Sequence, residues 1–354
     1  MSDLLQSLGL VPFFIQQLPD VELLQQRLGR VTSVQRSRNT VICGAGERVV
    51  ELSSPLLKSA AIDRPTVGDW VVLDASLTRI EQVLERKSLF KRLAAGERNE
   101  IQPIAANIDL LFILTSCNEE FKESRLERYL ALCAEAGASP VIVLTKADLA
   151  SDRDSYIQRA RSTQAGVPVE AVNALDPSSL DSVRCWIDKT TTVALVGSSG
   201  VGKSTLLNSL AGHTLTATGN IREQDKKGRH TTTHRELHRL PSGGLLVDVP
   251  GMRELRVAEI EQSIGAVFDD IERLAAQCQF ADCKHDTEPG CAVQQAVAEN
   301  RLDSRRLANY KKLLRENALA TTTLAEKRAQ GRAFAKVVKE GKKIKQTRTK
   351  GQSS

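Results

Sequence analysis

The sequence has no apolar run long enough to cross a membrane and no recognisable export signal. Its longest apolar stretches, such as residues 110–114, are far shorter than the ~20 residues that a membrane-spanning helix needs. The N-terminus places an acidic residue, Asp3, before its apolar stretch and lacks the basic segment that opens a signal peptide. We therefore expect a cytoplasmic protein without a membrane partner.

The composition excludes two further classes of chain. Hydrophobic residues make up 41% and charged residues 26% of the 354 residues, which is ordinary for a soluble globular protein. A wholly disordered chain and a collagen-like chain are therefore excluded. At roughly 150 residues per domain, the length indicates two or three domains.

Cysteine is present, but its pattern does not suggest disulfide bonds. The count of seven is odd, and the chain is large and without an export signal. Three cysteines lie within fourteen residues of one another. The other four lie singly in apolar surroundings and are expected to be buried: Cys43, Cys117, Cys133 and Cys185.

The net charge of +6 is unevenly distributed. Between Lys327 and Lys350, ten Lys or Arg residues face one acidic residue, Glu340. Such a tail is typical of an arm that binds a polyanion, either nucleic acid or an anionic membrane, or of a disordered tail that only adds solubility. The tail has one aromatic residue, Phe334, so base stacking is not expected to be its main mode of binding.

The first part of the chain predicts a helical extension and then a small β-barrel. Residues 1–28 have a helical pattern without candidate functional residues. Short β-like runs follow, separated by glycine and proline, at 29–34, 40–43, 48–52, 69–73 and 80–84. Strands of this number and length fit a closed barrel such as the OB-fold, which often binds single-stranded nucleic acid. We place this domain at residues 29–95.

The middle of the chain predicts a parallel α/β sheet. Apolar strands at 109–115, 141–145, 168–172 and 192–196 alternate with helices at 121–136, in the 150s and at 180–188. After Gly251 the strands cease, and helices are expected at 257–275 and 292–318. We therefore place an α/β domain at 96–255, a small helical domain at 256–326 and the basic tail at 327–354.

A phosphate-binding loop follows the strand at 192–196. Residues 197–204 match G-x-x-x-x-G-K-[ST] in the strand-loop-helix context that this motif requires. Lys203 would reach the β- and γ-phosphates, and Ser204 would bind Mg²⁺. The alternative is an inert glycine turn. The predicted nucleotide-binding residues of this loop are Gly197, Ser198, Ser199, Gly200, Val201, Gly202, Lys203, Ser204 and Thr205.

Two further segments indicate that the nucleotide is GTP. Asp248 ends an apolar strand and can hold Mg²⁺ through water, while the N–H of Gly251 can reach the γ-phosphate. The run Thr145, Lys146, Ala147 and Asp148 resembles the guanine-specific box N-K-x-D. The Asp148 carboxylate can accept hydrogen bonds from two N–H groups of guanine, a donor pair that adenine lacks. The alkyl stem of Lys146 can lie along the base.

The order of these segments is unusual. Small GTPases ordinarily begin with the phosphate loop and end with the guanine box, whereas here residues 145–148 precede residues 197–204. We interpret this as a circular permutation. Residues 228–234 contain threonines that can serve as switch I, or form only a polar surface loop. Since the chain runs from Asp248 straight into the helical domain, we expect switch II to act on that domain directly.

A cluster of cysteine and histidine predicts a structural zinc site. Cys278, Cys283, His285 and Cys291 supply three thiolates and one imidazole within fourteen residues, a set that tetrahedral Zn²⁺ accepts. Disulfides or coincidence are the alternatives. A catalytic zinc is not expected, because four protein ligands leave no open position.

Together these segments closely resemble the RsgA (YjeQ-type) family of circularly permuted GTPases. The resemblance spans residues 29–320 and also includes R-P-x-x-G-D-W-V at 64–71, A-A-N-x-D at 105–109 and R-L-E-R-Y-L at 125–130. It implies an N-terminal OB-fold, a permuted α/β P-loop GTPase domain and a C-terminal helical zinc-knuckle domain.

The resemblance also implies a function. Members are GTPases that bind the small ribosomal subunit and its ribosomal RNA, are stimulated by it and act in its late maturation. The expected cofactors are GTP/GDP, Mg²⁺ and one structural Zn²⁺. We hypothesise that hydrolysis to GDP and phosphate releases the protein from the subunit. Thr232 is implied as the Mg²⁺-binding switch threonine and His230 as the residue near the attacking water. With Lys203, these are the predicted catalytic residues of an expected monomer.

Three positions depart from the usual patterns. Thr145 replaces an Asn whose amide would bind guanine N7 and tether the loop, and Asn173 replaces a frequent Ser. Met252 stands where Ras-like enzymes place a Gln that orients water. We therefore hypothesise a slow intrinsic GTPase whose site is completed on the ribosome, by ordering of the His230 loop or by RNA groups.

Three other functions stay open at this point. An RNA-modifying or transport enzyme that uses the GTPase as a clock is disfavoured, because no second catalytic motif is present. A membrane-surface GTPase is disfavoured because residues 327–350 lack a sustained apolar face. A nucleotide-gated RNA-binding module without catalysis can be separated from the main hypothesis only by measuring turnover.

Overall fold

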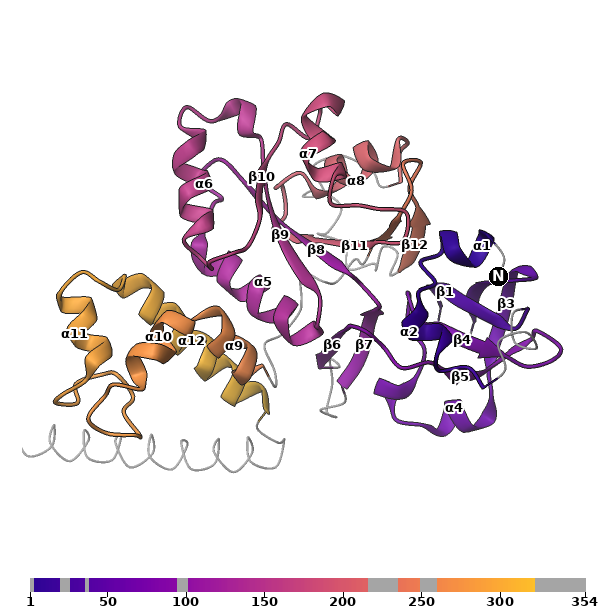
Figure 1. Cartoon of the computed structure of the whole chain (residues 1–354), viewed down its shortest axis with the longest axis horizontal. Helices are drawn as coiled ribbons and strands as arrows, with labels where there is room; N and C mark the ends of the chain where they lie inside the picture. Colours follow the sequence, from indigo (N-terminus) through magenta and orange to yellow (C-terminus); the bar gives the residue numbers. More distant parts are fainter. Residues whose placement is uncertain are drawn as a thin grey trace, which may run out of the picture.

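A computed structural model of the protein describes residues 3–19, 26–35, 38–93, 101–215, 235–248 and 260–321. Figure 1 shows a β-barrel at one end, an α/β layer in the middle and a helical group at the other end. The candidates His230, Thr232, Gly251 and Met252 and the tail at 327–354 lie outside the described residues.

The N-terminal barrel is confirmed. Its strands are β1 (Leu28–Val34), β2 (Asn39–Cys43), β3 (Gly46–Leu52), β4 (Trp70–Leu73) and β5 (Arg79–Val83), with α4 (Ser54–Lys58) and the short turn η1 (Ala61–Asp63) between β3 and β4. They pair in the order β1-β2-β3-β5-β4, and β4 returns to pair with β1. This closed five-stranded arrangement is that of an OB-fold. Alternate apolar side chains, such as Val31, Val41 and Ile80, fill its interior.

The first residues form part of the core. The helices α1 (Asp3–Ser7) and α2 (Pro12–Ile15) bury Leu5 and Phe14, and Leu8, which follows α1, is also buried. The ring of Phe14 lies 5.7 Å from that of Trp70 at the start of β4. The predicted helical extension therefore packs against the barrel.

The central α/β layer is also confirmed. Its strands are β8 (Leu110–Ser116), β9 (Ser139–Thr145), β10 (Val169–Ala171), β11 (Thr192–Gly197), β12 (Glu236–Arg239) and β13 (Leu245–Asp248), in the order β10-β9-β8-β11-β13-β12. All but β12 are parallel to their neighbours. The sequence did not predict β12. The helical segments are α5 (Glu123–Ala136), η2 (Ala147–Leu149), α6 (Arg153–Arg161), η3 (Pro177–Leu180), α7 (Asp181–Arg184) and α8 (Lys203–Ala211).

The barrel and the α/β layer share one sheet. Strand β12 pairs with β13 on one side and, through Glu236 and Ser33, with β1 on the other. An eleven-stranded sheet results. A separate hairpin of β6 (Leu89–Leu93) and β7 (Ile101–Ala106) leads from the barrel into β8 and was not predicted.

The two helices expected near the C-terminus are each divided. They are α9 (Glu261–Val267), α10 (Asp269–Ala275), α11 (Ala292–Ala298) and α12 (Ser304–Thr321). The expected helix at 292–318 is interrupted because Asn300 adopts a left-handed backbone conformation, with φ of 55°. The N–H groups of Arg301 and Leu302 then donate to the carbonyl of Ala296, which ends α11.

The burial of single cysteines follows the prediction at three of four positions. Cys43, Cys117 and Cys133 are buried, but the prediction was wrong for Cys185, which is exposed. Cys185 directly follows the last residue of α7, midway between the buried Val183 and Ile187. Residues four apart share one side of a helical turn, so Cys185 lies on the other side. Among the described residues, no helix has the length and apolar composition that crossing a bilayer requires.

The C-terminal helices dock on α5 through buried ion pairs. Glu127 of α5 is fully buried and lies 3.0 Å from Arg306 and 3.1 Å from Arg305, both of α12. Arg306 also bonds the carboxylate of Asp270 on α10 at 2.8 Å and the carbonyl of Thr163. Burial opposes the ionisation of Asp270, but the hydrogen bond and charge of Arg306 outweigh it and lower the pKa of Asp270. One guanidinium therefore joins two helices of the C-terminal group to the α/β layer.

Replacing Arg306 is expected to destabilise the whole chain. Arg306→Leu leaves the buried Glu127 carboxylate with fewer donors, and breaking a buried pair in this way typically costs about 3–5 kcal/mol. Denaturant unfolding measures the loss. The control is Arg273→Leu, which breaks an exposed pair with Asp269 on α10 and should cost less than about 1 kcal/mol. Equal effects of the two substitutions would contradict the buried anchor.

Candidate nucleotide site and candidate zinc centre

Three predicted segments meet at one edge of the sheet. Strand β9 ends at Thr145, β11 ends at Gly197 and β13 ends at Asp248. These strands are parallel to one another, so their carboxyl ends face the same side, where α/β sheets usually bind ligands. The fold therefore brings together the phosphate loop, the guanine box and Asp248, which lie far apart in the sequence.

The phosphate loop wraps around its own lysine. Lys203 Nζ donates to the carbonyl oxygens of Gly197, at 2.8 Å, and of Ser198. A Cβ at Gly197 would lie 2.5 Å from the Leu114 carbonyl oxygen, and Gly202 has a φ of 92° just before α8. Both positions therefore need glycine. The loop delivers a cation and the free N–H groups of a helix N-terminus to one place, which suits a polyphosphate.

Ser204 and Thr205 occupy the first turn of α8. Both are half-buried. Ser204 offers a hydroxyl and Asp248, across the edge on β13, offers a carboxylate; oxygen donors of this kind are the ligands that Mg²⁺ prefers. The donor set therefore fits a magnesium ion.

The hydroxyl of Thr145 ties the guanine box to the phosphate loop. Thr145 is fully buried, and its Oγ1 lies 2.5 Å from the Val201 carbonyl oxygen and 3.3 Å from that of Thr115. Lys146 Nζ adds a second link, 2.9 Å to the carbonyl of Gly200. The sequence argument expected the change from Asn to Thr to remove a tether of this loop. The structure shows that the Thr145 hydroxyl supplies a tether of its own.

The remaining guanine-box residues lie at the rim. Asp148 is exposed on η2, beside Ala147, whose N–H donates to the Val172 carbonyl at 3.3 Å. The side-chain oxygen of Asn173 accepts from the N–H of Leu175 at 3.0 Å. Asn173 therefore orders its own turn, directly beside the guanine box.

The predicted zinc ligands converge. The ligand atoms of Cys278, Cys283, His285 and Cys291 all lie within 4.8 Å of one another. His285 Nδ1 is 3.6 Å from Cys278 Sγ and 3.5 Å from Cys291 Sγ, and the two sulfurs are 3.9 Å apart. Ligands at tetrahedral zinc distances have S···S separations of about 3.8 Å and S···N separations of about 3.5 Å. The set therefore fits one zinc ion.

Two stabilising contacts could not be found from the sequence. Lys311 of α12 donates to the backbone carbonyl of His285 and lies 2.7 Å from Asp286. Thr145 contacts a carbonyl fifty-six positions away. Neither contact has a local sequence signal, because both depend on how distant elements pack.

The strand order and the two nucleotide segments define a P-loop GTPase domain in permuted order. The family model described as RsgA GTPase matches residues 83–258. The small ribosomal subunit biogenesis GTPase RsgA 2 of Vibrio parahaemolyticus is 46% identical over 338 residues, covering 96% of this chain and 92% of that protein. The small ribosomal subunit biogenesis GTPase RsgA of Mesorhizobium japonicum is 43% identical over 318 residues, covering 88% of this chain and 90% of that one.

Solved structures agree with the fold. The crystal structure of YjeQ from Thermotoga maritima aligns with a TM-score of 0.61 at 25% identity, covering 82% of this chain and 98% of that one. YloQ, a circularly permuted GTPase, aligns with a TM-score of 0.57 at 23% identity over 83% of this chain and 96% of its own. The chain belongs to the RsgA family. The predicted fold class and enzyme class, a permuted GTPase, are thereby confirmed.

Loss of one cluster cysteine is expected to remove the zinc. Cys283→Ser takes away one of four ligands, and tetrahedral structural sites bind zinc weakly with three. Elemental analysis of purified protein measures this. We expect one zinc per chain in the wild type and in the control Cys185→Ser, whose cysteine is exposed and outside the cluster. A full equivalent retained by Cys283→Ser would contradict the assignment.

The Thr145 tether is expected to support nucleotide affinity. Thr145→Val keeps the volume but removes the donor to Val201, so the phosphate loop loses one of its fixed positions. Loss of one buried hydrogen bond corresponds to about a tenfold weaker binding of GDP. Titration calorimetry measures it, with Thr145→Ser as the control that keeps the hydroxyl. Wild-type affinity in Thr145→Val would show that the contact does not affect the bound state.

Proposed function

We propose that the protein binds the small ribosomal subunit and acts in its late maturation. It hydrolyses GTP to GDP and phosphate, is stimulated by the subunit and leaves it after hydrolysis. The observation that supports this most directly is the near full-length similarity to proteins named small ribosomal subunit biogenesis GTPases. The geometry of the phosphate loop and guanine box is consistent with the GTPase part of the proposal.

The phosphate loop would hold the triphosphate. Lys203 would exchange its carbonyl partners for β- and γ-phosphate oxygens, and the loop from Gly197 to Thr205 would surround them with N–H groups. Ser204, Thr232 and Asp248 are the residues proposed to hold Mg²⁺, directly or through water. The ion would neutralise charge that develops on the phosphates. The N–H of Gly251 is proposed to contact the γ-phosphate.

The guanine box would select the base. On this proposal the carboxylate of Asp148, which is exposed, accepts two hydrogen bonds from guanine. Lys146, anchored on Gly200, holds its alkyl stem at the same rim. Because the Thr145 hydroxyl is committed to Val201, base recognition in this proposal rests on Asp148.

Catalysis is proposed to be incomplete in the isolated protein. Met252 cannot orient a water molecule, so His230, or groups supplied by the subunit, would complete the site. On this proposal GTP favours the subunit-bound state. Hydrolysis relaxes the switch segments and releases the protein.

The remaining parts are proposed to hold RNA. The division into an extension (1–28), an OB-fold (29–95), a GTPase domain (96–255), a zinc domain (256–326) and a basic tail (327–354) is supported by the closed barrel and by the Cys/His cluster. The hairpin β6–β7 pairs across the proposed boundary at residue 95. The tail, with its excess of Lys and Arg, suits ribosomal RNA. We propose a cytoplasmic monomer.

Small subunits are expected to accelerate GTP hydrolysis. Supplying one missing group that stabilises the transition state is typically worth about 10²–10³ in rate, so the steady-state rate should rise at least tenfold. The measurement compares phosphate release with purified small subunits, with large subunits and with neither. Lys203→Ala should abolish hydrolysis under all conditions, whereas Lys189→Ala, an exposed lysine before β11, should not.

The outcomes separate the rival functions. Equal rates with and without small subunits would overturn the proposed stimulation. Nucleotide binding and subunit binding without turnover would instead support an RNA-binding module gated by nucleotide. Binding to anionic vesicles but not to subunits would favour a membrane-surface GTPase.

A further inference from the structure

A polar cavity lies where the first residues, the barrel and the α/β layer meet. Its volume is about 170 Å³, several times the ~30 Å³ that one water molecule takes in the liquid. Gly9 and Val11 line it from the extension, Arg30 from β1 and Thr192 from the start of β11. Strand β11 ends at the phosphate loop, so the cavity is at the opposite edge of the sheet from the candidate nucleotide site.

The guanidinium of Arg30 is buried beside this cavity, and no described residue forms an ion pair with it. Arg30 is 1% exposed, and in the described part of the chain its hydrogen-bond acceptors are all carbonyl oxygens: Leu8 at 2.5 Å, Gly68 at 3.1 Å and Asn107 at 3.1 Å. These use three of its five N–H groups. The other two have no partner among the described residues. Burial lowers the pKa of Arg30 to about 10, and the charges of Asp109 and Asp69 offset this only in part. The guanidinium also lies over the Trp70 ring, 5.7 Å from its centroid.

The two carboxylates whose charges raise the pKa of Arg30 form ion pairs with other cations. Asp69 forms two hydrogen bonds with Arg86, at 2.8 and 2.9 Å, and Asp109 lies 2.7 Å from Lys87. Among the described residues, neither carboxylate therefore forms a hydrogen bond with Arg30. Buried charges in proteins are normally paired. An anion in the cavity would supply the missing partner.

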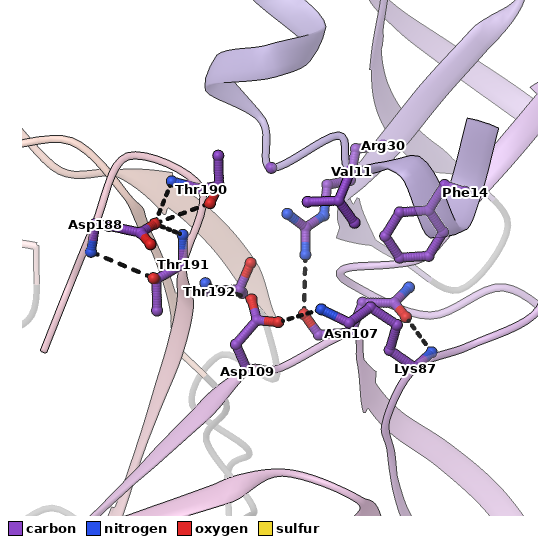
Figure 2. A pocket seen from close by; sticks show the side chains of 11 residues that line it. Val11, Phe14, Arg30, Lys87, Asn107, Asp109, Asp188, Thr190, Thr191 and Thr192 are labelled. Carbon is purple, nitrogen blue, oxygen red and sulfur yellow. Dashed lines mark hydrogen bonds and ion pairs between the residues drawn. The ribbon is translucent and has the colours of Figure 1, made fainter. Parts of the chain in front are cut away.

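The far wall of the cavity carries one more carboxylate, and it is already satisfied. Figure 2 shows Asp188 across the cavity from Arg30, turned toward the backbone of Thr190 and Thr191. Its Oδ1 accepts from those two N–H groups at 2.7 and 2.8 Å and also from the Thr190 hydroxyl. Asp188 is exposed, so solvent screens its charge from the interior.

A buried hydroxyl adds a donor without an acceptor. Thr192 lines the cavity and is 0% exposed, and its Oγ1 has no hydrogen-bond partner in the described part of the chain. A buried hydroxyl in this state costs free energy unless something bonds to it. Figure 2 shows Thr192 between Asp109 and Thr191, next to the space that Arg30 faces.

We propose that this cavity binds a small oxyanion, a phosphate or a carboxylate. The anion accepts hydrogen bonds from the two remaining N–H groups of Arg30 and from the Thr192 hydroxyl, with Lys87 at the entrance. Bound there, it joins the extension, the barrel and the α/β layer. The site is independent of the nucleotide site and of the function proposed above.

The test uses the full chain with Lys203→Ala, which weakens anion binding at the phosphate loop. Inorganic phosphate and formate are titrated separately in low-chloride buffer by calorimetry, and each titration is repeated with Thr192→Val. We expect saturable binding of at least one anion, about tenfold weaker in Thr192→Val because one hydrogen bond to a charged group is lost. The anion that binds more tightly identifies the class of ligand.

A matched control keeps the test specific. Thr115 also has a buried Oγ1 without a partner among the described residues, but it does not line the cavity. Thr115→Val should therefore leave anion binding unchanged, and neither substitution should lower the unfolding midpoint without anion. Absence of saturable binding would overturn the proposal. Equal anion affinities of the Lys203→Ala chain with and without Thr192→Val would overturn it too, as would an equal loss of affinity in Thr192→Val and Thr115→Val.

Discussion

The parallel pairing of β8 with both β9 and β11 is the constraint on which the nucleotide site depends. Leu114 of β8 pairs with Val143 on one side and with Gly197 on the other, so the guanine box and the phosphate loop are one strand apart. The close approach of Gly197 to the Leu114 carbonyl and the bond from Thr145 to Val201 then fix the two loops against each other. These contacts belong to the sheet, not to chain order, and so the permuted connection leaves the site intact.

The same sheet reaches the barrel through its edge strand. Strand β12 pairs with β13 along its length, but with β1 at one registered pair, Ser33 and Glu236. Arg235, just before β12, donates to the carbonyl of Pro103 in the hairpin β6–β7 at 3.1 Å. Strand β12 follows the segment predicted as switch I directly. The barrel and the hairpin therefore both contact the residues that directly follow the predicted switch I segment, which are Arg235 and strand β12.

Local patterns in the sequence were sufficient for most of the architecture. Barrel strands and parallel strands have apolar alternation or continuous apolar runs, and the phosphate loop and Cys/His cluster are defined by spacing over a few residues. Strand β12 escaped prediction because it has one buried residue, Leu237, and its pairing partners are distant in sequence. The contact of Thr145 with Val201 was not predicted, because the sequence does not show to which carbonyl a threonine hydroxyl donates. The docking of Arg306 on Glu127 depends likewise on tertiary packing.

The contact between Arg306 and Glu127 changes how a bound nucleotide can act on the zinc domain. The sequence suggested a direct pull through the chain that leaves β13. The structure adds a second attachment, because α12 and α10 bond through Arg306 to the helix that connects β8 and β9. Separating them would also expose several buried apolar side chains, such as Leu130 and Ile264, each worth about 1.5–3 kcal/mol when fully buried. A ligand shifts an equilibrium only by its differential affinity for the two states, commonly about 1–3 kcal/mol. The C-terminal helices and α5 should therefore move together as one unit.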